Sequence, residues 1–244
     1  MKVFKFHHRS YSNLTMTRSE IAQQLIAVCR ALYEKGFVTA NDGNVSARLP
    51  NGNILTTPTS LNKGRVTEND LVEVTINGSP VGPGSIPSSE LGMHLFIYQQ
   101  RVDINAVVHA HPTYATAFAT ARIPLDQPLY PEVIFGLGTI PLADFATPST
   151  REVADSIAPF VHSSTAILLT NHGVVAFGKD LDDAYFKMEK VEHAAHITFV
   201  ARMLGGEKNL TVEQVGKLNA TFSKQRAQES GRKPSPQSHK DTET

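Results

Sequence analysis

The stretch AILLTNHGVVAFG, residues 166–178, decides which kind of fold this chain can adopt. Its two apolar runs, AILLT and VVAFG, have the length and the β-branched content of buried strands. Asn171-His172-Gly173 between them is typical of a tight turn. Two strands that are joined by so short a turn must run antiparallel. The stretch therefore predicts an antiparallel hairpin with a histidine at its tip.

Sequence signals on either side of this hairpin predict further strands and helices. Strands are expected around the turn Asn51-Gly52, at 45–49 and 54–57, and again at 71–76, 104–111 and 139–142. Helices are expected from the capping box of Thr17 and Glu20 to Gly36, from Ser88 or Ser89, from the capping box of Ser149 and Glu152 to Pro159, and from Asp180 to Gly205-Gly206. Because no regular βαβ repeat runs through this order, we predict a single-domain α/β fold. Its central sheet is mainly antiparallel, with helices on both faces.

Composition narrows the class of protein. Lys plus Arg and Asp plus Glu number 23 each, so the chain has no net charge that would attract nucleic acid. No apolar run reaches the ~20 residues that span a bilayer, and no signal peptide is recognisable, so we expect a cytoplasmic protein without membrane partners. Cys29, the only cysteine among 244 residues, excludes an internal disulfide.

The chain is expected to have three parts. Residues 1–16 are predicted to be an N-terminal extension, and Met16 is an alternative start. Residues 17–210 are predicted to form the folded domain. Residues 211–244 are predicted to be a C-terminal segment that ends in a disordered tail from Ser223, because the tail is polar and charged.

Three histidines are candidate metal ligands. His109 and His111 are two residues apart in the strand expected at 104–111, so both side chains project from one face, about 6–7 Å apart along the backbone. His172 at the hairpin tip is a third candidate, and Glu90 at a helix start is a fourth ligand or a neighbour. Three imidazoles with an exchangeable position are the set expected for a catalytic ion.

The two histidines of the strand would not suffice by themselves, because hydrogen-bonded histidines in a core or on a surface have the same spacing. His94, one helical turn after Glu90, is expected either to support the site or simply to be packed. His162, His193 and His196 are expected to be structural. Lys63 and Lys179 are expected to be solvated or to steer a phosphate, and not to act as nucleophiles.

Five motifs together resemble the class II aldolase/adducin family over residues 17–210. They are GNVSAR at 43–48, TPTS at 57–60, PSSE at 87–90, HAHP at 109–112 and NHG at 171–173. The resemblance implies a three-layer α/β/α fold and one divalent metal, usually zinc, held by His109, His111, His172 and Glu90. Cobalt, manganese and iron suit the same ligands.

The resemblance also implies a phosphate site and an acid/base. Gly43, Asn44, Thr59, Ser60, Ser88 and Ser89 would bind the phosphate of a sugar phosphate, and Glu90 would move a proton on the carbon next to the carbonyl. Glycine, hydroxyl and amide groups suit this role because they allow close backbone approach and donate hydrogen bonds. The sequence departs from the family at Asp42, which must point away from a phosphate, and at Ser60, where glycine is common.

The implied reaction is the reversible aldol cleavage of a ketose 1-phosphate to dihydroxyacetone phosphate and an aldehyde. Tyr130 is the expected second proton-transfer group, acting in a neighbouring subunit of a homotetramer, and Glu132 is the alternative. Leu129, Ile134 and Phe135 suggest an aldehyde with an apolar end, such as a deoxy or methylthio pentulose or hexulose phosphate would give.

Three other functions remain open. A pentulose-phosphate 4-epimerase usually has aspartate where Glu90 stands and a late tyrosine, whereas no tyrosine follows Tyr185 here. A sugar-acid phosphate decarboxylase tends to lack the two serines before the glutamate. An adducin-like interaction module of the same fold would need no metal ligands.

Overall fold

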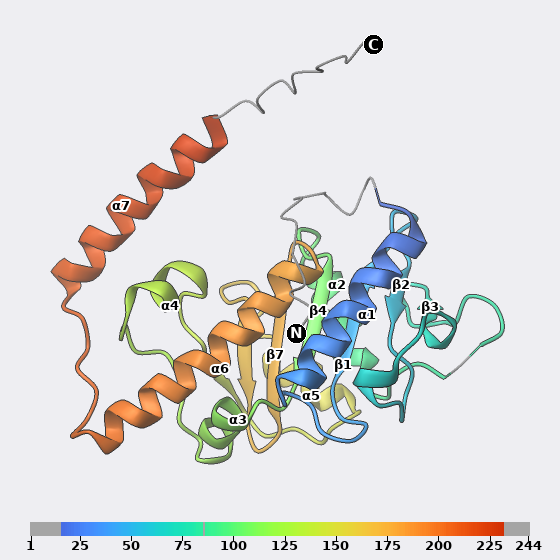
Figure 1. Ribbon diagram of the computed structural model, residues 1–244, viewed down its shortest axis with the longest axis horizontal. Coiled ribbons are helices and arrows are strands. Elements are labelled where there is room, and N and C mark those ends of the chain that lie inside the picture. The colour runs from blue at the N-terminus through green and yellow to red at the C-terminus, as the bar shows by residue number, and fades with distance from the viewer. Residues whose placement is uncertain (1–15, 85, 232–244) are drawn as a thin grey trace, which may run out of the picture.

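A seven-stranded sheet forms the centre of the protein within residues 16–84 and 86–231, the part that the computed structural model describes (Figure 1). Its strand order is β3-β2-β1-β4-β7-β6-β5. The strands are β1 (Asn44–Arg48), β2 (Ile54–Thr56), β3 (Val72–Val74), β4 (Ala106–Ala110), β5 (Leu142–Ala143), β6 (Ala166–Leu169) and β7 (Gly173–Gly178). Neighbouring strands pair antiparallel, except β5 and β6, which are parallel. The prediction of an α/β fold with a mainly antiparallel sheet is therefore confirmed.

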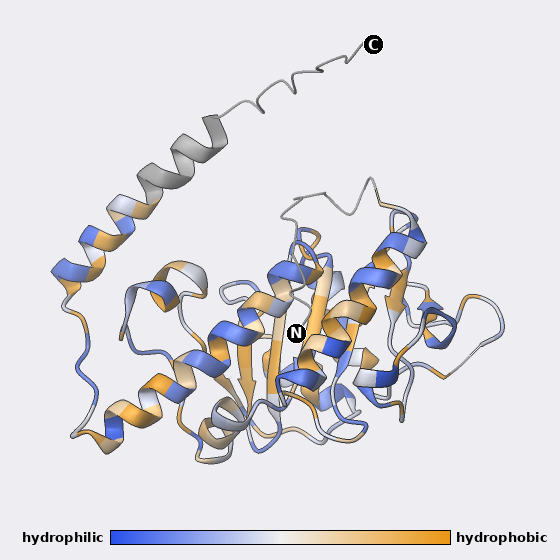
Figure 2. Cartoon of the chain, viewed as in Figure 1, coloured by the Kyte–Doolittle hydropathy of each residue, from blue (hydrophilic) through white to orange (hydrophobic). Residues whose placement is uncertain are grey.

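The central strands are apolar on both faces because helices cover both (Figure 2). In β4 the alternation of side chains divides the strand between two hydrophobic clusters. Ala106, Val108 and Ala110 join one cluster, whereas Val107 joins the other. A strand that is buried on both sides has no polar face, which explains why residues 106–108 read as a continuous apolar run.

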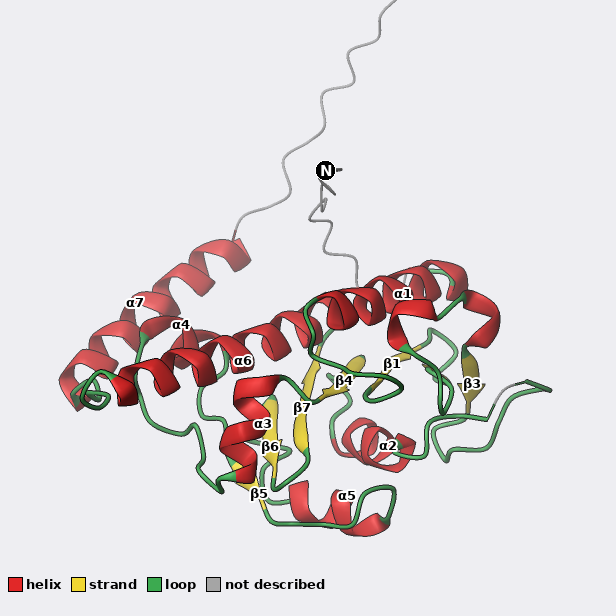
Figure 3. Cartoon of the chain, turned by 60° about the horizontal axis from the view of Figure 1, so that its bottom comes forward, coloured by secondary structure: helices red, strands yellow, loops and turns green. Residues whose placement is uncertain are grey.

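Helices α1 (Arg18–Glu34) and α6 (Leu181–Met203) cover one face of the sheet, and α2 (Leu91–Gln100) and α5 (Arg151–Ile157) cover the other (Figure 3). The remaining α-helices are α3 (Thr113–Thr120), α4 (Pro131–Gly136) and α7 (Val212–Gly231), and the short 3₁₀ helices are η2 (Lys63–Arg65) and η3 (Glu68–Asp70). Phe135 of α4 stacks on Phe222 of α7, with ring centroids 4.1 Å apart. No described helix is both long and apolar enough to cross a membrane.

Local signals in the sequence place several elements correctly. Thr17 and Glu20 form the predicted capping box at the start of α1. The hairpin of β1 and β2 turns at Asn51-Gly52, where Gly52 has a φ of +85°. Asn171 has a φ of +55° at the tip between β6 and β7, a conformation that asparagine tolerates better than most residues. Helix α6 starts after its N-cap Asp180, as predicted.

Two helix starts were predicted one or two residues too early. The N-cap of α2 is Glu90 instead of Ser88 or Ser89, and the hydroxyl of Ser88 accepts a hydrogen bond from the backbone N–H of Glu90. The N-cap of α5 is Thr150 instead of Ser149. Ser149 cannot cap because it has a φ of +64°, whereas N-cap residues are extended.

Two further predictions about elements need correction. The strand expected at 139–142 is β5 at Leu142–Ala143, and β4 ends at Ala110, so His111 follows the strand instead of closing it. Helix α7 continues to Gly231, so residues 223–231 of the tail expected to be disordered are helical. Thr211 and Gln214 exchange the hydrogen bonds of a capping box at its start, and helix-forming Gln, Lys, Arg, Ala and Glu follow. Residues 1–15 and 232–244 lie outside the described residues.

Candidate metal centre and active site

Three imidazoles meet at one end of the sheet. Ligand nitrogens of His109, His111 and His172 all lie within 4.8 Å of one another. The sheet brings them together because β4 pairs with β7, with His109 opposite Val175 and Ala110 opposite Val174. The turn that precedes β7 therefore lies beside the end of β4, and it carries His172 to the other two histidines.

Hydrogen bonding orients His109 as a metal ligand. Its ring is fully buried, and Nδ1 lies 2.9 Å from the carbonyl oxygen of Val174. Because a carbonyl only accepts, Nδ1 carries a proton, which leaves Nε2 as the nitrogen that would bind an ion. Nε2 of His109 lies 3.1 Å from Nε2 of His111, so the two nitrogens face the same point.

Glu90 lies against two of the three histidines. Its Oε2 is 3.2 Å from Nε2 of His109, and its Oε1 is 3.1 Å from Nε2 of His172. The side-chain amide of Asn44 donates to Oε2 at 3.0 Å. Oε1 is buried and has no hydrogen bond of good geometry among the described residues. Glu90 is thus placed either to join the ligands of an ion or to take protons beside it.

The pKa values of Glu90 and His111 reflect how closely the groups of the cluster face one another. Burial by itself would raise the pKa of Glu90, but the charge and hydrogen bonds of His109 and His172 outweigh burial and hold that pKa well below its usual range. Burial and the neighbouring charges of His109 and His172 lower the pKa of His111 to about 3. Nitrogen and carboxylate lone pairs that face one point at these distances suit a divalent ion, so the residues fit the implied metal.

Two glycines let the backbone come close to the histidines. Gly43 has a φ of +71°, and a Cβ there would lie 2.8 Å from the carbonyl oxygen of His109. A Cβ on Gly173 would lie 2.5 Å from Cδ2 of His111 and 2.6 Å from the carbonyl oxygen of Ala110. Real Cβ atoms do not come so close, so the position of each loop depends on glycine.

A polar cavity of about 220 Å³ adjoins the histidines. Its lining includes His111, Glu90 and all six residues expected to bind phosphate, which are Gly43, Asn44, Thr59, Ser60, Ser88 and Ser89. Backbone hydrogen bonds join the loops that carry the hydroxyls, because Thr59 N–H donates to Ile86 and Ser88 N–H donates to Thr57. Ser60 has a φ of +55°, a conformation in which glycine is more relaxed.

Asp42 lines the same cavity but faces a histidine. Its carboxylate is about half exposed, at 52%, and Oδ2 lies 3.7 Å from Nδ1 of His111. The expectation that Asp42 points away from a phosphate is therefore not met, and its negative charge in the lining weakens the assignment of this cavity to a phosphate. The negative charge of Asp42 lies beside His111, which is a candidate metal ligand.

Tyr130 and Glu132 do not line this cavity within one chain. Tyr130 is the half-buried N-cap of α4, and it lines a small pocket together with Val133 and Arg202. Burial, followed by the charge of Glu132, raises the pKa of Tyr130 to about 12. Glu132 is exposed.

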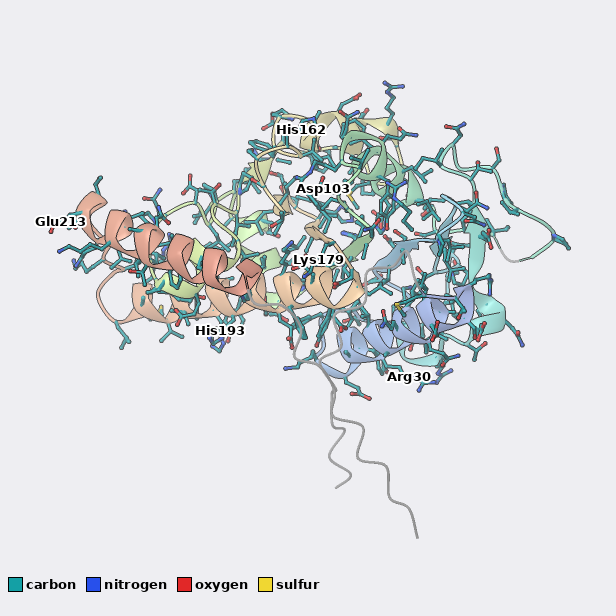
Figure 4. The ribbon with its side chains drawn as sticks, turned by 90° about the horizontal axis from the view of Figure 1, so that it is seen from above. Arg30, Asp103, His162, Lys179, His193 and Glu213 are labelled. Carbon is teal, nitrogen blue, oxygen red and sulfur yellow. The ribbon has the colours of Figure 1, made fainter. Side chains whose placement is uncertain are left out.

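The other histidines lie outside the cluster. His94 is buried, and its Nδ1 lies 2.7 Å from the hydroxyl oxygen of Ser46. His162 and His193 are exposed on different sides of the molecule (Figure 4), and His196 stacks on Tyr114 at 3.9 Å. Lys63 is buried, so the expectation that it is solvated is wrong. It lines the polar cavity, and the alternative expectation, that it steers a phosphate, stays a prediction.

Comparisons with known proteins agree with this geometry. The family described as Class II Aldolase and Adducin N-terminal domain matches residues 23–199. An L-fuculose phosphate aldolase of Methanococcus maripaludis is 37% identical over 74% of this chain and 97% of its own length. A 3-oxo-tetronate 4-phosphate decarboxylase of Escherichia coli is 31% identical over 78% of this chain and 91% of its own length.

Solved structures give the same two kinds of relative. An L-fuculose 1-phosphate aldolase has a TM-score of 0.78 and 34% identity, and the match covers 85% of this chain and 98% of that one. YgbL of Klebsiella pneumoniae, for which aldolase, epimerase and decarboxylase activities are all named as candidates, also has a TM-score of 0.78. Its identity is 29%, over 83% of this chain and 99% of that one.

Proposed function

Because the chain belongs to the class II aldolase and adducin family, we propose that it is a metal-dependent lyase that cleaves a ketose 1-phosphate reversibly to dihydroxyacetone phosphate and an aldehyde. The observation that carries the proposal is the convergence of His109, His111 and His172, with Glu90 in contact with two of them. A hydroxyl-lined cavity beside them suits the phosphate of the substrate.

The chain's own residues divide the work. His109, His111 and His172 would hold the ion, which when bound supplies Lewis-acid polarisation of the substrate's carbonyl. Glu90 returns a proton to the carbon next to the carbonyl after the carbon–carbon bond breaks, and it removes that proton in the direction of condensation. Asn44 holds Oε2 of Glu90 through its amide and thereby orients the carboxylate. Gly43, Asn44, Thr59, Ser60, Ser88 and Ser89 anchor the phosphate.

The proton on the hydroxyl of the broken bond requires a second group. We assign it to Tyr130 of a neighbouring subunit, because Tyr130 does not line the cavity of its own chain. This assignment requires an oligomer, and we propose a homotetramer with sites at subunit interfaces. Light scattering should give four times the 26.6 kDa of one chain. We further propose that the bound ion is zinc and that the protein is cytoplasmic.

A coupled assay for dihydroxyacetone phosphate tests the reaction. We would supply a panel of ketose 1-phosphates, including deoxy and methylthio compounds, to metal-loaded and chelator-treated protein. Turnover should require the metal, and His172→Asn should lose both metal and activity. His193→Asn is the matched control, because His193 is exposed and lies outside the cluster. Equal activity with and without metal would refute the mechanism, and a purified protein that binds no metal would favour the interaction module.

The decarboxylase relatives support a second candidate reaction. Loss of carbon dioxide from a 3-oxo-tetronate 4-phosphate leaves the same three-carbon ketone phosphate, with the same proton to be returned next to a carbonyl. The residues placed here suit either bond cleavage. Release of carbon dioxide from that acid, together with no turnover of any ketose 1-phosphate, would decide for the decarboxylase.

A further inference from the structure

Lys63 has a buried ammonium group beside the polar cavity. The residue is 1% exposed, and Nζ donates to the carbonyl oxygens of Asn41 at 2.8 Å and Leu61 at 2.7 Å. These carbonyls belong to two separate loops. One loop leads into Gly43 and Asn44, and the other follows Thr59 and Ser60. A single side chain therefore ties together the two loops that carry the proposed phosphate ligands.

The charge of this ammonium is not balanced locally. No carboxylate of the described residues lies within ion-pair distance of Nζ, and burial lowers the pKa of Lys63 despite the more distant charges of Asp42 and Glu90. The neighbouring thiol of Cys29 is neutral, because burial raises its pKa to about 12. A buried charge is normally paired, since removing it from water is costly.

The ammonium also has a hydrogen-bond donor to spare. It has three N–H groups, and the described residues accept from two of them. Lys63 is the one lysine or arginine among the described residues that line the cavity. Hydroxyl and amide donors already bind a phosphate more strongly than a neutral hydroxyl group, and the ammonium adds a Coulomb attraction that a neutral group does not experience.

We propose that Lys63 determines specificity for the phosphate of the substrate. Its ammonium is the counter-charge of the phosphate dianion, and it holds the loops of Gly43 and Ser60 in position to bind it. The inference rests on the proposed function, since it concerns the same cavity. Through Lys63 the protein would discriminate phosphorylated from unphosphorylated substrates.

Inorganic phosphate is the probe for the first experiment. Calorimetry on the full-length, metal-loaded protein would compare the wild type with Lys63→Met, which removes the charge, and with Lys63→Gln, which keeps N–H donors for the carbonyls. Both variants should bind phosphate at least tenfold more weakly and retain their metal. Lys179→Met is the matched control, because Lys179 is an exposed lysine, and it should bind phosphate as the wild type does.

A second measurement separates a role in specificity from a purely structural one. In the direction of condensation, kcat/KM would be measured with dihydroxyacetone phosphate and with dihydroxyacetone. Loss of the counter-charge should lower kcat/KM for the phosphorylated donor at least tenfold and leave the other value unchanged. Equal losses for both donors would show that Lys63 only holds the loops, and would overturn the inference.

The outcomes also distinguish this inference from the proposed function. A wild type that binds no phosphate would count against a sugar-phosphate substrate altogether. A wild type that binds phosphate, with variants that bind it equally well, would refute the role of Lys63 alone. If both variants fail to fold, the ¹⁵N resonance of the Lys63 ammonium in the wild type decides: it should shift with phosphate, and no shift would overturn the inference.

Discussion

At the scale of single residues, Gly173 is the position where one added methyl group would most directly disturb the histidine cluster. Gly173→Ala would place Cβ 2.5 Å from Cδ2 of His111 and 2.6 Å from the carbonyl oxygen of Ala110. The φ of Gly173 lies outside the left-handed region, so the strain comes from these two contacts and not from the backbone conformation. His111 must move, and we expect the affinity for metal to fall about 10- to 100-fold, as for other losses of ligand orientation.

Competition with a chromophoric chelator would measure that loss of affinity. Gly216→Ala in α7 is the control, because a Cβ there has no atom within 4 Å. It should bind metal as the wild type does. Unchanged affinity in Gly173→Ala would mean that the hairpin tip moves away freely, and that His111 does not need the tight contact.

His94 gives a prediction about pH. Burial, and then the charge of His109, lowers the pKa of His94 from 6.5 to about 3. Between these values the unfolded chain binds a proton that the folded protein does not bind, so the free energy of unfolding decreases as the pH falls. We expect His94 alone to account for about 3 kcal/mol between pH 7 and pH 4.

Urea unfolding of chelator-treated protein at several pH values tests this contribution. His94→Gln does not titrate, and its side-chain oxygen can accept a hydrogen bond from Ser46 in place of Nδ1. Its stability should therefore depend less steeply on pH than that of the wild type. Parallel curves for the two proteins would show that His94 titrates normally in the fold.

At the scale of elements, helix α6 determines where α3 begins. The carboxylate of Glu192 accepts the backbone N–H of Tyr114 at 3.0 Å and that of Ala115 at 2.9 Å. The N-cap of α3 is Pro112, whose side chain cannot accept a hydrogen bond. The carboxylate of Glu192, on helix α6, takes the place of the missing N-cap side chain. Because α3 starts directly after His111 and Pro112, this contact also fixes the backbone that carries His111.

We therefore expect Glu192→Ala to lower the free energy of unfolding by about 1–2 kcal/mol, as the loss of a cap and of a charge at a helix start would. Its affinity for metal should fall as well. Glu213→Gln is the control, since Glu213 lies on α7 (Figure 4) and pairs there with the exposed Lys217. We expect a change below about 0.5 kcal/mol. Chemical unfolding and metal titration would measure both effects. A stable Glu192→Ala with normal metal binding would contradict the role of this contact.

The elements also show which features a sequence can predict. The capping box at Thr17, the turn at Asn51-Gly52 and the hairpin tip at Asn171 depend on residues close in the chain, and all three are correct. The predicted start of α5 was one residue too early because Ser149 has a left-handed backbone, which the sequence pattern does not indicate. The capping box of Thr211 and Gln214 was present in the sequence and overlooked.

In the candidate site, too, features with local sequence signals could be predicted and features that depend on distant contacts could not. The convergence of three histidines could be predicted, because a strand and a hairpin tip carry them and the antiparallel pairing of strands is easy to recognise. The roles of Glu192 and Lys63 depend on contacts between elements far apart in the sequence. A buried lysine has no local signal that distinguishes it from a solvated one.

At the scale of the whole molecule, the histidine cluster joins segments that are distant in the chain. Glu90 precedes α2 on one face of the sheet, His109 lies in the central strand β4, and His172 belongs to the turn between β6 and β7. The unfolded chain cannot assemble these groups, so an ion binds almost exclusively to the folded protein and stabilises it as a unit. Free metal at 1,000 times its dissociation constant would add about 4 kcal/mol.

We expect chelation to lower Tm by about 8–16 °C, since each kcal/mol shifts Tm by about 2–4 °C in a domain of this size. Calorimetric scans at equal protein concentration, with and without chelator, would measure the change. His172→Asn is the decisive companion, because it removes one ligand: its Tm should lie near that of the chelated wild type and should hardly respond to chelator. His193→Asn should respond as the wild type does. A wild-type Tm that is insensitive to both chelator and added metal would show that these imidazoles meet around no ion, and the proposed mechanism would lose its basis.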